Sequence, residues 1–195
     1  MYRLILCFIL SLLSGCSVTQ PRHIDNVCQI FAEKDAWYEA ARDAEKHWGT
    51  PIAVQMASMH QESAFVADAE PPAPLILGFI PWFKSSSAYG YAQAQDGTWA
   101  DYQKQTSHRF RSRDDFADSC DFIGWYCSVS HNKLGIDNND AYNLYLSYHE
   151  GHGGFRRNSH NHKQWLLTTA QKVANRSQYF ANQLKSCRAS LEANQ

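Results

Sequence analysis

One carboxylate, Glu62, lies where the sequence could support acid–base chemistry. It belongs to the run MHQESAF, residues 59–65, which ends an apolar segment with helical spacing. A solvated glutamate, with a pKa of about 4.3, is ionised at neutral pH and cannot donate a proton. Burial among apolar side chains raises that pKa, and Met59, Ala64 and Phe65 are suitable neighbours. Glu62 is therefore a candidate general acid, and the alternative from this run alone is a surface glutamate at a helix end.

Two short motifs follow Glu62 in order along the chain. The first is GYAQ, residues 90–93, and the second is LSYHEG, residues 146–151. The first has the glycine and glutamine of a Gly-x-x-Gln turn. The second lies on a predicted helix and brings Tyr148 close in sequence to a second acid, Glu150. Each motif is weak alone, but the ordered set is specific.

The Glu-Ser pair, the Gly-x-x-Gln turn and the helical tyrosine together resemble the lytic transglycosylase and goose-type lysozyme family. They also resemble a lipoprotein-borne subfamily of it. The resemblance covers the chain from about Trp37 onward. It implies an all-α fold with a single lysozyme-like helical domain, acting without cofactor or metal. It also implies cleavage of the MurNAc-β-1,4-GlcNAc bond in peptidoglycan glycan strands.

The resemblance further implies roles for individual residues. Glu62 would be the catalytic acid/base, and Tyr148 would position it. Ser63 would bind substrate or support Glu62. The expected substrate-binding residues are Ser63, Gly90, Tyr91, Gln93, Tyr148 and Glu150. The chain departs from the family pattern at Ser147, at His149 and at the Tyr91-Ala92 pair, which leaves the subfamily open.

Most glycosidases use two carboxylates, whereas the family that this chain resembles uses one. The resemblance implies that Glu62 first protonates the leaving oxygen and then removes a proton from the sugar's own 6-hydroxyl. The product would be a 1,6-anhydro-MurNAc end. If Glu150 activated a water instead, the same fold would act as a lysozyme-type hydrolase. A non-catalytic peptidoglycan-binding lipoprotein and a metal-binding lipoprotein are the remaining alternatives.

The N-terminus is typical of a bacterial lipoprotein signal. Arg3 precedes a short apolar run, residues 4–13, which as a helix would rise only about 15 Å, half of a hydrocarbon core. The sequence LSGC, residues 13–16, resembles a lipobox. We therefore expect residues 1–15 to be a signal peptide, 16–34 a tether lipidated at Cys16, and 35–195 the catalytic domain. Ser17 after the lipidated cysteine predicts an outer-membrane lipoprotein with its domain facing the periplasm.

Four cysteines follow Cys16, in a compartment where disulfides persist. Cys28 begins the folded region and Cys187 nearly ends it, so a bond between them would join the two ends of the domain. Cys120 and Cys127 are about 10 Å apart along a predicted helix, too far for a direct bond within it. Either they are buried thiols or the helix breaks between them. The absence of a Cys-x-x-Cys pair disfavours a metal site.

Apolar stripes at helical spacing predict an all-α domain without strands. The stripes cover residues 37–48, 51–62, 114–134 and 164–187, and shorter helices begin near 96 and 140. We expect Thr50, Asp96 or Thr98, and Asn139 or Asp140 to cap helices, and Gly151, Gly153 and Gly154 to break one. The formal net charge of −1 offers no electrostatic basis for binding nucleic acid.

Three other segments have open interpretations. The apolar loop 75–83 could form a small second core, a wall of the cleft or a membrane contact. The histidines at 149, 152, 160 and 162 lack a zinc-binding spacing, which favours a polar surface or a cleft rim. The basic segment 107–113 reads as a solvated loop or as a contact for acidic stem peptides. Protein partners stay open.

Overall fold

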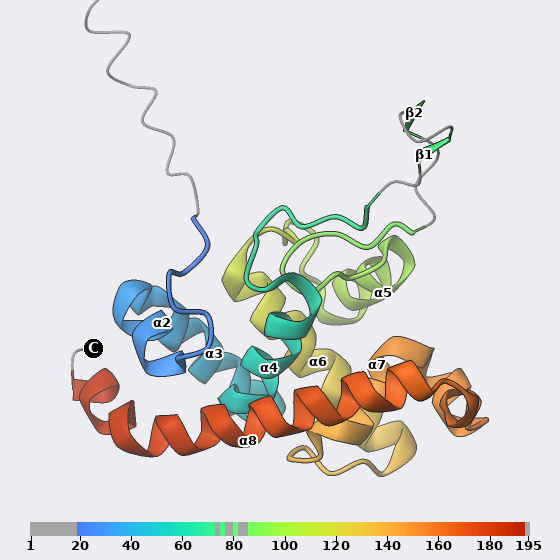
Figure 1. Cartoon of the computed structure of the whole chain (residues 1–195). Helices are drawn as coiled ribbons and strands as arrows, with labels where there is room; N and C mark the ends of the chain where they lie inside the picture. Colours follow the sequence, from blue (N-terminus) through green and yellow to red (C-terminus); the bar gives the residue numbers. More distant parts are fainter. Residues whose placement is uncertain (1–18, 73–74, 77–79, 82–85, 194–195) are drawn as a thin grey trace, which may run out of the picture.

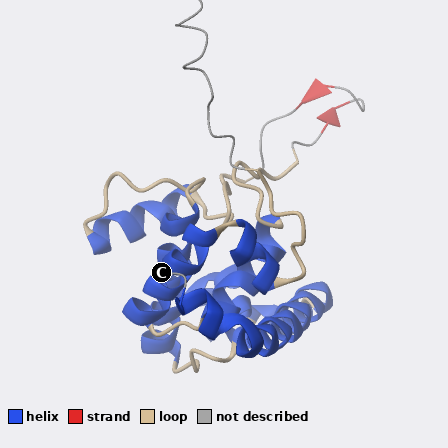
Figure 2. Cartoon of the chain, turned by 90° about the vertical axis from the view of Figure 1, so that its left-hand side faces the viewer, coloured by secondary structure: helices blue, strands red, loops and turns tan. Residues whose placement is uncertain are grey.

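The protein is an all-α domain, as the sequence predicts. The computed structural model describes residues 19–72, 75–76, 80–81 and 86–193, and helices form the body of this part (Figure 2). In chain order the helices are α2 (Val27–Glu33), α3 (Asp35–Trp48), α4 (Ile52–Ser63), α5 (Asp96–Thr106), α6 (Phe116–Leu134), α7 (Ala141–Arg156), the 3₁₀ turn η1 (Ser159–His162) and α8 (Gln164–Ala193).

Helix α4 runs through the middle of the molecule, between α8 and α6 (Figure 1). Its first eight residues, Ile52 to Met59, are all buried, so the expected single apolar face is in fact a fully enclosed helix. Only its last turn approaches the surface. This arrangement carries Glu62 from the centre of the core to the edge of the fold, where a partly covered carboxylate can meet solvent.

Helix α6 contributes four buried aromatic side chains to the core: Phe116, Phe122, Trp125 and Tyr126. Its N-cap is Asp115, whose side chain accepts the backbone N–H of Asp118. Gly124 lets α3 approach closely, because a Cβ there would lie 2.6 Å from the Trp48 ring. The indole N–H of Trp48 then donates to Asp121 at 2.8 Å, which fixes α3 against α6.

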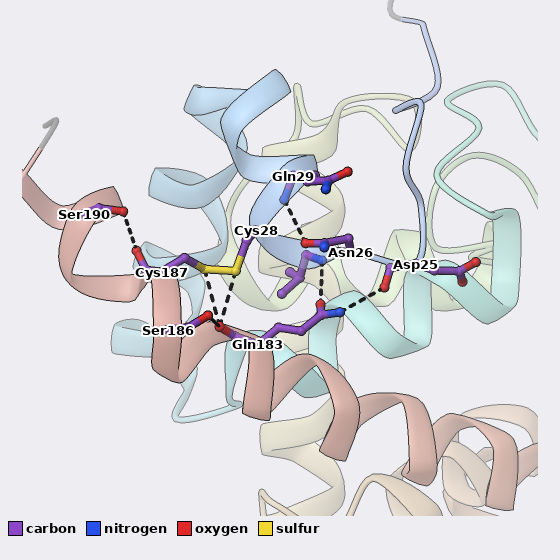
Figure 3. The surroundings of a disulfide bond; sticks show 9 residues. Asp25, Asn26, Cys28, Gln29, Gln183, Ser186, Cys187 and Ser190 are labelled. Carbon is purple, nitrogen blue, oxygen red and sulfur yellow. Dashed lines mark hydrogen bonds between the residues drawn. A yellow bond between two sulfur atoms is a disulfide. The ribbon is translucent and has the colours of Figure 1, made fainter.

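Helix α2 is held against the distal half of α8 (Figure 3). The expected Cys28–Cys187 disulfide joins them across 159 residues of sequence. Gln183 strengthens the junction, because its side chain accepts the N–H of Val27 at 2.8 Å and donates to the carbonyl of Asp25. The predicted tether, 16–34, is therefore too long: residues 27–33 belong to the folded body. On the chain-entropy model a bond that closes so long a loop contributes about 5 kcal/mol.

The two remaining cysteines are buried thiols, the first of the two predicted alternatives. Cys120 and Cys127 both lie inside α6, which continues unbroken between them. Burial raises the pKa of both thiols, so neither is activated as a nucleophile.

Several predicted caps and breaks are wrong in detail. Thr50 does not cap α4, because its hydroxyl donates to the carbonyl of Gly124 instead. The N-cap of α5 is Gln95, and Asp96, inside the helix, pairs with Arg113 at 2.9 Å. Asp140 caps α7 as expected, accepting the N–H of Asn143. Of the three glycines that we expected to break this helix, Gly151 does so, whereas Gly153 and Gly154 do not.

Helix α7 continues to Arg156 with one interruption, at Gly151. The backbone there adopts φ 70° and ψ 158°, outside the helical region. A positive φ is readily available to glycine, which explains why the interruption falls on this residue. The helix turns at this point and resumes, so Gly153 and Gly154 lie within it.

A short antiparallel pair lies in the segment that we predicted to be a loop. Strands β1 (Leu75–Ile76) and β2 (Ile80–Pro81) pair Leu75 with Pro81 and Ile76 with Ile80. Both views show them apart from the helices (Figures 1 and 2). The side chains on which the three interpretations of this segment depend lie outside the described residues. So do the expected signal peptide and Cys16.

Candidate active site

A cleft of about 500 Å³ opens where α4 ends, between α7 on one side and the segment before α5 on the other. Its lining combines one end of α4, the second half of α6, the middle of α7 and residues 86–98. These lining residues are Glu62, Ser86, Ala88, Gln93, Ala94, Gln95, Thr98, Phe122, Tyr126, Tyr148, His149, Glu150 and Gly151. Of the seven candidate cleft residues, the structure therefore brings four together: Glu62, Gln93, Tyr148 and Glu150.

Glu62 has the environment of a general acid. Burial raises the pKa of its carboxyl group to about 7, and a hydrogen bond with the Tyr145 hydroxyl lowers it somewhat. Among the residues that the structure describes, no cation contributes to this balance, so the carboxyl group has little to stabilise its charged form. At neutral pH a substantial fraction of Glu62 is protonated and able to donate.

Tyr145 is the residue that sequence reasoning missed. We expected Tyr148 to position Glu62, but the Tyr148 hydroxyl donates to the carbonyl of Ala92. The two tyrosines lie three residues apart on α7, on the same side of the helix. Tyr145 is thus the hydrogen-bonding neighbour of the carboxyl group. Tyr148 lies close enough to Glu62 for the Glu62 charge to contribute to the raised pKa of the Tyr148 hydroxyl. Through its bond to Ala92, Tyr148 also holds the Gly-x-x-Gln turn on the other side of the cleft.

The Gly-x-x-Gln turn is a rigid wall of the cleft. Gly90 has φ +80°, and a Cβ there would lie 2.0 Å from the carbonyl oxygen of Arg113, so only glycine fits. Gln93 donates both amide hydrogens within this region, to the carbonyls of Ala69 at 2.7 Å and Gly90 at 3.0 Å. Both amide hydrogens of Gln93 are thus used within the protein, and its amide oxygen remains as a hydrogen-bond acceptor in the cleft lining.

Two of the expected substrate-binding residues do not face the cleft. Tyr91 is fully buried, with its ring edge-on to Trp37 and Phe116, so it is a core residue. Ser63 donates its hydroxyl to the carbonyl of Met59 within α4 and is absent from the cleft lining. Gly90 acts through backbone shape alone. In this structure Tyr91 and Ser63 thus make contacts inside the fold, and Gly90 shapes the turn.

Glu150 faces the same cleft in the opposite electrostatic state. Lys163 lies 2.6 Å from its carboxylate, Ser159 donates a second hydrogen bond, and the His149 ring lies 3.3 Å away. These contacts, led by Lys163 and Ser159, hold the pKa of Glu150 down to about 2. Because its side chain is only 4% exposed and its oxygens are already engaged, Glu150 is poorly suited to activate a water.

The histidines and the basic segment are more engaged than the sequence suggested. His149 lies on the cleft rim, whereas His152 stacks on Tyr126 and His160 on Phe155. Within the described part of the chain, no group of three or more His, Cys, Asp or Glu side chains could hold a metal ion. In the segment 107–113, Arg111 pairs with Asp118 at 2.7 Å, so this loop is partly tied down.

Comparison with known families agrees with this geometry. The family model described as the transglycosylase SLT domain matches residues 4–187. The chain belongs to this family, whose name points to lytic transglycosylase activity on peptidoglycan. No curated protein and no solved structure matches the chain at a significant level. In the described residues, no helix is both long and apolar enough to span a membrane.

Proposed function

We propose that the protein is a peptidoglycan lytic transglycosylase that cleaves the MurNAc-β-1,4-GlcNAc bond with Glu62 as its single acid/base. The observation that carries the proposal is the pair of carboxylates in one cleft. Glu62 has a pKa of about 7 and is free of any cation, whereas Glu150 is bound by Lys163 and Ser159. Only one acid is therefore available for proton transfer at neutral pH.

The proposed reaction has two proton transfers, both at the Glu62 carboxyl group. Protonated Glu62 donates to the glycosidic oxygen as the bond from that oxygen to the MurNAc anomeric carbon breaks. The N-acetyl group of MurNAc stabilises the cation that develops. The Glu62 carboxylate then takes the proton from the MurNAc 6-hydroxyl, whose oxygen bonds to the anomeric carbon. The products are a 1,6-anhydro-MurNAc end and a free GlcNAc 4-hydroxyl, with Glu62 protonated again.

The rest of the cleft supports binding in this proposal. The Gln93 amide oxygen offers an acceptor to sugar hydroxyl or amide groups. The rings of Phe122, Tyr126 and Tyr148 give the cleft an aromatic floor. Such a floor suits the apolar faces of sugar rings, while the polar rim orients the strand.

The location of the enzyme is a separate proposal. We propose that Cys16 is lipidated and anchors the protein in the outer membrane, with the catalytic domain in the periplasm. The lipobox-like LSGC sequence and the serine at position 17 support this. Several acyl chains would make such an anchor effectively stable. Labelling with a radioactive fatty acid in cells, with Cys16→Ala as control, tests it.

The activity is tested by mass spectrometry of the muropeptides released from purified sacculi by the soluble domain, beside Glu62→Gln. We expect anhydro-MurNAc products from the wild type only. Reducing MurNAc ends would identify a lysozyme-type hydrolase and overturn the single-acid mechanism. Tight binding to sacculi without release from either protein would favour a peptidoglycan-binding module.

A further inference from the structure

Trp165 is a large aromatic side chain that the fold does not use in its core. It is 57% exposed, although it adjoins the buried stripe of α8. That stripe consists of Leu166, Ala170, Val173, Ser177, Phe180 and Leu184. Position 165 precedes the stripe by one residue and therefore points about 100° away from it. Core packing does not require a tryptophan there.

The position of Trp165 is nevertheless fixed, because the start of α8 is tied to the rim of the cleft. Its ring meets the His149 ring edge-to-face, with centroids 5.0 Å apart at 77°. Two residues earlier, Lys163 binds Glu150. His149 and Glu150 are consecutive and both line the cleft. Trp165 thus lies beside the cleft without lining it, in the first turn of α8.

We propose that Trp165, backed by His149, is a stacking platform for one further N-acetylhexosamine ring of the glycan strand, extending the cleft beyond Glu150. The inference rests on the proposed function for its substrate class. A polysaccharide continues past both ends of a cleft, and the C–H faces of its sugars pack on exposed indole rings. An aromatic ring held in place before binding loses little conformational freedom when a sugar stacks on it.

The binding test uses the inactive Glu62→Gln protein, so that the ligand stays intact. Isothermal titration calorimetry measures the affinity of three proteins for peptide-free peptidoglycan glycan strands. They are Glu62→Gln alone, Glu62→Gln with Trp165→Ala, and Glu62→Gln with Trp165→Phe. We expect the alanine variant to bind about tenfold more weakly, and the phenylalanine variant to recover most of the loss. Tyr179→Ala is the matched control, since Tyr179 is 55% exposed on the same helix but does not line the cleft. It should bind normally.

Strand length provides the second readout. A distant subsite serves only strands long enough to reach it, so Trp165→Ala should lose affinity for long strands and keep it for a disaccharide. Equal affinity of the alanine variant and its parent for long strands would overturn the proposal. So would an equal loss in Tyr179→Ala.

The two proposals can fail separately. If the wild type releases no muropeptides but the tryptophan still governs strand binding, the platform stands and the enzymatic function falls. If the wild type is active, Trp165→Ala should raise KM for sacculi about tenfold with kcat nearly unchanged, as expected for binding lost equally in ground and transition states. A fall in kcat at constant KM would contradict the platform.

Discussion

Two carboxylates face the same cleft, and their surroundings drive them to opposite protonation states. Glu62, at the end of α4, is surrounded by buried apolar groups and aromatic hydroxyls, with a pKa of about 7. Glu150, in the middle of α7, is enclosed by Lys163, Ser159 and His149, with a pKa of about 2. The same side-chain chemistry thus yields a carboxyl group that is partly protonated at neutral pH on one side and an anion on the other.

The difference arises from the backbone around each residue. Glu62 lies in the last turn of a helix whose preceding turns are buried, and in the described part of the chain no cation shifts its pKa. Glu150 precedes the interruption at Gly151, after which the chain turns back through η1. That return brings Ser159 and Lys163 onto the carboxylate. A general acid needs apolar surroundings such as those of Glu62, whereas a structural ion pair needs hydrogen-bonding partners such as those of Glu150.

The largest expected effect separates the two residues by activity. Glu62→Gln should lower the rate of muropeptide release by about 10²–10⁴-fold, because the proton donor is lost. Glu150→Gln should retain activity within about tenfold, since that side chain transfers no proton. Release from sacculi, quantified by chromatography for both variants, checks this.

Each variant tests the other. The two substitutions are isosteric and lie in one cleft, so general damage to the site would affect both. Equal, severe losses would mean that Glu150 takes part in the chemistry. In that case reducing-end products from the wild type would identify it as the base of a hydrolase.

The pH dependence should follow Glu62 alone. Its protonated form is the active one, so kcat/KM should fall about tenfold per pH unit above pH 7, where that form is depleted. Glu150, with a pKa of about 2, stays ionised throughout the neutral range. Glu150→Gln should therefore keep the same alkaline limb. An alkaline limb that moves in this variant would contradict the separation of the two groups.

Stability should change with opposite sign in the two variants. The folded state raises the pKa of Glu62, so it binds more protons than the unfolded chain between about pH 4.5 and 7, and stability falls as pH rises through this window. Glu62→Gln should escape that loss and be more stable at pH 8 by about 1–3 kcal/mol, with no gain at pH 4.

Glu150→Gln should behave in the opposite way. The folded state lowers the pKa of Glu150, so its contribution is present above about pH 4.5 and is lost as pH falls toward 2. The variant should lose about 1–2 kcal/mol at pH 7, through the hydrogen-bonded ion pair with Lys163. Denaturant titrations at pH 4 and pH 8 measure both effects. A loss of stability at pH 8 in both variants would refute the contrast.

The sequence predicted the helices and the apolar surroundings of Glu62 because both depend on local patterns. The stripes of α3, α6 and α8 and the apolar approach to Glu62 can be read from nearest neighbours along the chain. The enclosure of α4 on all sides could not be read in this way, because it depends on α6 and α8, which are distant in sequence. The same limit applied to Tyr91, whose place in the core is set by Trp37 and Phe116.

The side chains that bond Glu62 and Glu150 could not be predicted from the sequence for a related reason. Tyr145 and Tyr148 share one side of α7, and helical spacing does not say which hydroxyl reaches Glu62. For Glu150, the partners Ser159 and Lys163 lie beyond a glycine-rich stretch that we expected to end the helix. A helix that resumes after a break is difficult to predict from sequence. The direction of the chain after a glycine with positive φ is set by tertiary contacts.

The smallest predicted effect concerns the hydrogen bond between Glu62 and the Tyr145 hydroxyl. Tyr145→Phe removes a hydroxyl that stabilises the Glu62 carboxylate, so the pKa of Glu62 should rise further and the alkaline limb should move to higher pH. Below pH 7 the rate should fall about three- to tenfold, because the anion formed on proton donation has lost a hydrogen bond. Above pH 8 the difference in rate from the wild type should shrink, since more of the Glu62 in the variant stays protonated.

The pH profile of kcat/KM measures both the rate loss and the shift of the alkaline limb. Tyr142→Phe, one turn earlier on α7, is the control. A uniform loss at every pH would mean that Tyr145 serves packing alone and does not tune the acid.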